Sequence, residues 1–129
     1  MKALTPDTIR APFARYSHGV EIPANWRIVQ TSGQLGIRPD DSIPEDAYEQ
    51  AKICFKGIEE ILKEAGMNSG DVAHISAFVT DRKHMAGYMK ARDEFIGEPD
   101  RLASSTLLIV SGFTREEFKV EVEVMAAAP

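Results

Sequence analysis

The sequence lacks the cysteine and the long apolar runs that would suggest an exported or membrane protein. Its single cysteine, Cys54, cannot form an internal disulfide, and its place in a helical pattern predicts a small core residue. No apolar run approaches the roughly 20 residues of a membrane span. The opening stretch "MKALTPDTIRAPFARY" has charges and prolines where a signal peptide needs an apolar segment. We therefore expect a cytoplasmic protein without a membrane partner.

Excess positive charge and metal-ligand motifs are also missing. The formal net charge is −5, and no stretch combines clustered Lys and Arg with aromatic residues, so we expect no nucleic-acid partner. His18, His74 and His84 are far apart and have no Cys or His at metal-ligand spacing, so no metal is expected. His18 and His74 have no orienting partner nearby in the sequence, which favours structural roles. Fingerprints of phosphate-binding loops, dinucleotide sites and serine hydrolases are absent as well.

The first half of the chain predicts two strands and a helix within a single domain spanning residues 1–129. "GVEIPANWRIVQTSG" contains two extended segments around a Pro-Ala-Asn turn, which predicts a hairpin. "SIPE" at 42–45 has the form of a capping box. Apolar residues then recur at helical spacing from Ala47 to Ala65, and Gly66 is expected to end this helix.

The second half predicts a further helix between strands. Residues 72–80 alternate as a strand, Asp81 is a plausible N-cap, and the helical pattern from Met85 to Phe95 is followed by Gly97. Residues 118–126 alternate most regularly of all. The order β-β-α-β-α-β-β predicts an α+β fold, with a mixed β-sheet and both helices on one of its faces.

The opposite face of the predicted sheet carries polar groups. Glu121 and Glu123 protrude from the last strand, and "RLASSTLLIV" at 101–110 places three hydroxyl side chains before an apolar run. Such a face is either exposed to water or in contact with another copy of the chain.

Six stretches in the same order resemble the YjgF/RidA family and cover nearly the whole chain. They are "AP" at 11–12, "RYSHGV" at 15–20, "TSGQLG" at 31–36, "EQAKICFKGIEEILKEAGM" at 49–67, "DVAHISAFVTD" at 71–81 and "VEVEVMA" at 120–126. The resemblance implies a chorismate-mutase-like α+β subunit in a homotrimer, with ligand clefts between subunits. It also implies a cofactor-free deaminase that hydrolyses enamines and imines, such as 2-aminoacrylate, to a 2-keto acid and ammonia.

The resemblance assigns roles to individual residues. Tyr16 and Ser32 match the pocket Tyr and Ser of the family, and Glu121 matches the Glu that places the attacking water. The family Asn falls near Tyr88 or Met89, where this chain has no Asn. The three hydroxyls of the 101–110 stretch are thereby implied to lie where the strand enters the cleft.

The carboxylate-binding Arg of the family is missing. It should fall at Ser104 or Ser105, so the chain resembles a divergent branch of the family. Loss of such a contact typically costs about 2–5 kcal/mol. Arg101 is a candidate to replace it, and the alternative is a solvated loop charge.

Alternatives remain at the level of single residues and of the whole protein. Ser32 beside Gly33 could simply belong to a turn or bulge, and Tyr16 could be an aromatic residue that hydrogen-bonds at an interface. Glu121 could lie on a solvated strand face. The leading hypothesis is hydrolysis of a small imine or enamine, with Glu121 as the catalytic residue and Tyr16, Ser32, Arg101, Ser104 and Ser105 as substrate-binding residues. A non-catalytic trimer that binds a small ligand is the alternative, and the acidic net charge argues against an endoribonuclease.

Overall fold

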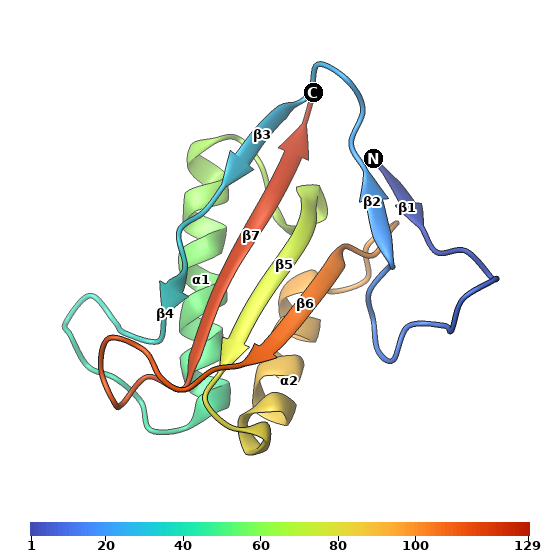
Figure 1. Ribbon diagram of the computed structural model, residues 1–129. Helices are drawn as coiled ribbons and strands as arrows, with labels where there is room; N and C mark the ends of the chain where they lie inside the picture. The colour runs from blue at the N-terminus through green and yellow to red at the C-terminus, as the bar shows by residue number, and fades with distance from the viewer.

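The computed structural model describes residues 1–129 and consists of a sheet covered by two helices (Figure 1). The five-stranded sheet comprises β3 (Arg27–Gln30), β4 (Gln34–Leu35), β5 (Val72–Val79), β6 (Ser104–Ile109) and β7 (Val120–Ala128). Its strand order is β3-β7-β5-β6, with β4 also paired to β7. Only β5 and β6 run parallel, so the sheet is mixed, as predicted.

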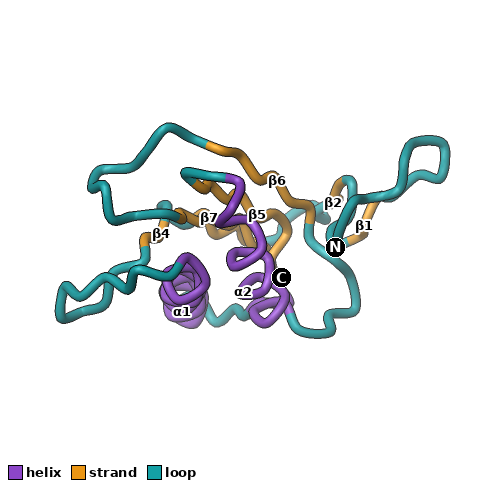
Figure 2. The backbone as a smooth tube through the Cα atoms, turned by 90° about the horizontal axis from the view of Figure 1, so that it is seen from below, coloured by secondary structure: helices purple, strands orange, loops and turns teal.

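Helices α1 (Ala47–Glu64) and α2 (Met85–Ile96) lie on the same face of the sheet (Figure 2). Short 3₁₀ turns at Ser69–Asp71 and Arg82–His84 precede β5 and α2. Neither helix combines the length and the apolar character that crossing a bilayer would need. The predicted α+β fold with both helices on one face is confirmed.

The core lies between the helices and the sheet. It is a cluster of 18 buried residues that includes Cys54, Ile58 and Leu62 from α1 and Val120 and Val122 from β7. Alternation along β5 and β7 points every second side chain into this core, as the periodicity predicted. The other side chains of these strands point to the face without helices, which we call the open face.

The start of α1 differs from the prediction. Asp46 is the N-cap, and its carboxylate accepts a hydrogen bond of 3.1 Å from the backbone N–H of Glu49. The capping box expected at 42–45 is therefore wrong, because the helix begins later than that box requires. The predicted ends are confirmed, since Gly66 and Gly97 follow the helices with φ of +70° and +57°, a conformation that favours glycine.

The hairpin predicted within 19–33 does not form. The first extended segment is β2 (Gly19–Glu21), which pairs with β1 (Lys2–Leu4) in a separate two-stranded sheet. The second segment is β3, which pairs with β7. The long β7 offers an edge along which both β3 and β4 pair, and this pairing lets Val29 pack against the core.

Candidate functional site

The open face is lined by polar and apolar side chains from four strands. The registers place on it Ile28 and Gln30 of β3, His74, Ser76 and Phe78 of β5, Ser104, Thr106 and Leu108 of β6, and Glu121, Glu123 and Met125 of β7. No Lys or Arg occupies these positions. The face thus offers carboxylates, hydroxyls and one imidazole, and it leaves Ile28 and Leu108 59% and 50% exposed.

Glu121 lies directly against the backbone of the Ser32–Gly33 segment. A Cβ atom added at Gly33 would overlap the Glu121 carboxylate, so only glycine permits this approach. The segment is fastened to β7 by Thr31, whose N–H donates to the Val124 carbonyl and whose hydroxyl accepts from the Val124 N–H, each at 3.0 Å. Glu121 and the exposed Ser32 are therefore brought together.

The environment of Glu121 suits a general base. Burial raises the pKa of Glu121, and the nearby charge of Glu123 raises this pKa further. A carboxylate with a raised pKa accepts a proton from water more readily than an ordinary one does.

Ser104 forms a hydrogen-bonded pair with His74 on the neighbouring strand. The Ser104 Oγ lies 2.7 Å from the His74 Nδ1 and 3.2 Å from the carbonyl oxygen of Ala73. The sequence predicted a structural role for His74 because no orienting partner is nearby in the sequence. That partner is 30 positions away and is brought opposite His74 by the parallel β5–β6 register.

Tyr16 lies in a segment that runs along the free edge of β6. The adjacent Ser17 donates its N–H to the Ala103 carbonyl at 2.9 Å and its hydroxyl to the Leu102 carbonyl at 2.8 Å. Ser17 also forms a β-bridge with Ser104. The Tyr16 segment and Ser104 are therefore neighbours within one chain.

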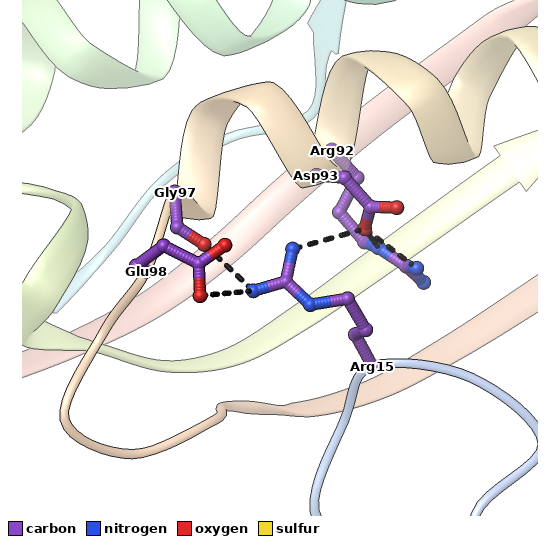
Figure 3. Close-up of polar contacts among 5 residues, drawn as sticks. All are labelled: Arg15, Arg92, Asp93, Gly97 and Glu98. Atoms are coloured by element: carbon purple, nitrogen blue, oxygen red, sulfur yellow. Dashed lines mark hydrogen bonds and ion pairs between the residues drawn. The ribbon is translucent and has the colours of Figure 1, made fainter.

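Arg15 fastens the same segment to the end of α2 (Figure 3). Its Nη2 donates to the Gly97 carbonyl at 2.7 Å and lies 3.8 Å from the Glu98 carboxylate, while its Nη1 lies 4.0 Å from the Asp93 carboxylate. The buried Arg92 also binds Asp93, at 3.0 Å. These contacts hold in place the backbone that carries Tyr16.

Two of the predicted site residues are not among the side chains of the open face. Ser105 occupies the alternate position of β6 and faces the helices, near the buried hydroxyl of Tyr88. Arg101 donates from Nη2 to the Gly70 carbonyl at 3.1 Å, and its Nη1 is buried without a partner. Of the two serines, the strand pleat turns only Ser104 to the open face, and the pocket role predicted for Ser105 stays a prediction.

The remaining residues form two separate groups on one chain. Ser32 and Glu121 lie at β4 and β7, whereas Tyr16 and Ser104 lie at the β6 edge. In the strand register, Ser104 of β6 lies opposite His74 of β5. Glu121 of β7 lies opposite Phe78, four residues further along β5 and on its other edge. The registers thus separate Ser104 from Glu121 by two strand spacings and four residues, roughly 16 Å. A small ligand cannot touch both groups of a single chain.

A model of the family described as endoribonuclease L-PSP matches residues 8–128. TdcF of Escherichia coli (strain K12), whose name gives it as a candidate reactive intermediate deaminase, is 28% identical over 123 residues, 93% of each chain. The 2-iminobutanoate/2-iminopropanoate deaminase of the same strain is 23% identical over 126 residues, 97% of this chain and 96% of that protein.

Solved structures share the fold. A Yersinia pestis protein, YyfB of the conserved Rid protein family, has a TM-score of 0.82 at 19% identity over 98% of both chains. The structure of E. coli TdcF with bound serine has a TM-score of 0.74 at 24% identity over the full length of both chains.

Proposed function

The chain belongs to the endoribonuclease L-PSP family, the YjgF/RidA family of deaminase relatives, and on that premise we propose that it hydrolyses a small imine or enamine. The products are a carbonyl compound and ammonia. In this proposal the reaction takes place in clefts between the subunits of a homotrimer, without a cofactor.

The observation that carries the proposal is the separation of the two residue groups. Glu121 with Ser32, and Ser104 with Tyr16, lie roughly 16 Å apart on one chain by strand register. We propose that contact between the open faces of neighbouring copies brings one group of each chain opposite the complementary group of its neighbour. The exposed Ile28 and Leu108 on this face supply apolar surface for such an interface.

The reaction requires a held water, a group that accepts a proton from it, and protons for the departing nitrogen. The water oxygen attacks the imine carbon while Glu121 accepts a proton from that water and the imine nitrogen takes up a proton from solvent, which gives a carbinolamine. Glu121 then returns its proton to the carbinolamine nitrogen, the C–N bond breaks, and ammonia leaves as the carbonyl forms and the hydroxyl proton passes to solvent. Ser32, Tyr16 and Ser104 bound the cleft and orient the substrate.

One observation favours a second candidate, a trimer that binds a small ligand without chemistry. The open face carries no Lys or Arg, and Arg101 is bound to the Gly70 carbonyl, so the carboxylate anchor implied by the family is not replaced. A protein that has lost this anchor can retain the cleft as a binding site only.

Ammonia release from imines generated in the assay separates the two candidates. We expect the wild-type protein to accelerate this release and Glu121→Gln to lower kcat at least about 100-fold, because the amide cannot accept the proton. Glu123→Gln is the matched control, since it removes a neighbouring carboxylate of the same strand face. Equal activity of Glu121→Gln and wild type contradicts the catalytic role, and an inactive wild type that still binds ligand supports the second candidate.

A further inference from the structure

The distances around Ser104 favour one tautomer of His74. The Ser104 Oγ lies 3.2 Å from the Ala73 carbonyl oxygen, which can only accept, and 2.7 Å from His74 Nδ1. The arrangement that satisfies both hydrogen bonds has the single hydroxyl proton on the Ala73 carbonyl and the ring proton on Nδ1. In a neutral imidazole this leaves Nε2 unprotonated, so that it is a hydrogen-bond acceptor.

The acceptor nitrogen is free. His74 Nε2 has no hydrogen-bond partner within the chain and is not a buried unpaired atom, so it is open to solvent on the open face. Burial lowers the pKa of His74, while Glu123 on β7, the one charged group that acts on it, opposes this change. His74 is therefore neutral at pH 7.

We propose that His74 is a specificity-determining residue that selects uncharged substrates, with Ser104 as its positioning residue. The inference rests on the proposed deaminase cleft and names its substrate class: a small imine or enamine that has an N–H or O–H donor and no carboxylate. Such a donor hydrogen-bonds to Nε2 of His74.

The charges of the open face support this selection. Ser104 is one of the two positions at which the resemblance implies a carboxylate-binding Arg, and the one of them that faces the open face. A neutral acceptor there cannot bind a carboxylate. Glu121 and Glu123 on the same face repel anions. An uncharged donor-bearing group loses nothing to this repulsion and gains the hydrogen bond to His74.

A matched pair of substrates tests the selection. An amine oxidase releases 1-propanimine from propylamine, and an amino acid oxidase releases 2-iminobutanoate from 2-aminobutanoate, so the two imines differ by one carboxylate. We expect kcat/KM to favour 1-propanimine, and His74→Phe to reduce this preference about tenfold, because an apolar ring provides no acceptor. His74→Gln should partly restore it. His84→Phe, the same change in the 3₁₀ turn Arg82–His84 that follows β5, is the control.

Nitrogen NMR tests the inference without catalysis. At pH 7 the Nδ1 of His74 should be protonated and its Nε2 unprotonated, and Ser104→Ala should abolish this tautomer preference. Propionamide, an uncharged N–H donor, should shift the Nε2 signal, and propionate should not.

If neither imine is hydrolysed by wild type, the proposed function fails while these spectra still decide the role of His74. A protonated Nε2, a response to propionate alone, a response to neither probe, or an unchanged preference in His74→Phe overturns the inference.

Discussion

The carboxylate of Glu121 occupies the space that a Cβ atom would fill at Gly33, so these two residues are in direct contact. Because Gly33 lies next to Ser32 in a segment fastened to β7 by Thr31, the backbone of this segment determines where the Glu121 carboxylate lies. The glycine of the "TSGQ" stretch is thus part of the candidate site itself.

Gly33→Ala should displace the Glu121 side chain and impair catalysis. The new methyl group overlaps the carboxylate, so we expect kcat to fall about 10–100-fold, as when a catalytic group is moved by about 1 Å. Steady-state kinetics measure the loss. Gly112→Ala is the control, since a Cβ there meets no atom within 4 Å. Full activity of Gly33→Ala would contradict the positioning of Glu121 described above.

The pH dependence of hydrolysis should follow the raised pKa of Glu121. A general base works when deprotonated, so kcat should rise with pH through a pKa above the ordinary value for a glutamate. Glu123→Gln removes the second cause of that raised pKa and should move the acidic limb of the profile to lower pH. Profiles of the two proteins measured over the same buffers provide the comparison, and coincident acidic limbs would rule out coupling between the two carboxylates.

The contribution of Glu121 to folding stability should fall with rising pH, whereas its contribution to kcat should increase. The raised pKa means that the folded chain binds this proton more tightly than the unfolded chain does, so its stabilising effect is present at low pH and is lost as pH rises through the folded pKa. At neutral pH, Glu121→Gln should therefore unfold at an equal or higher urea concentration than wild type. A clear loss of stability at neutral pH would mean that the carboxylate is held by favourable contacts.

A cation at position 104 should restore preference for carboxylate substrates. Ser104→Arg places a guanidinium at one of the two positions where the resemblance implies the family Arg, the one on the open face, and breaks the bond to His74. We expect kcat/KM for 2-iminobutanoate to rise by up to about 100-fold if part of a contact worth about 2–5 kcal/mol is formed. In the wild-type background, Arg101→Ala should leave kcat/KM for 2-iminobutanoate unchanged, because Arg101 binds the Gly70 carbonyl. A large effect of Arg101→Ala would instead identify Arg101 as the anchor.

Assembly through the open face should depend on its apolar residues. Sedimentation should give a species of about three times the 14.3 kDa chain mass. Leu108→Asp buries a charge in the proposed interface and should shift the protein to smaller species, whereas Ala86→Asp on the exposed side of α2 should not. A stable wild-type monomer at micromolar concentration would exclude the intersubunit cleft.

Local sequence patterns were sufficient for both helices and for β5 and β7, whereas the catalytic role of Glu121 was implied by the family resemblance. The alternation in 118–126 and 72–80 predicted β7 and β5, and it placed Glu121 on the face opposite the core. Gly66 and Gly97 marked the helix ends because glycine tolerates positive φ. These features depend on periods and backbone preferences that act within a few residues, so the sequence by itself determined them.

The tertiary structure alone decided how distant segments meet. Strand register turned Ser104 to the open face and Ser105 to the helices, a choice that three consecutive hydroxyls do not reveal. It paired β2 with β1, in place of the hairpin that the nearby turn predicted, and it brought Ser104 to His74 from 30 positions away. Such pairings depend on which strand edges are free and on which side chains the core accepts. These are properties of the whole fold, and no local sequence window contains them.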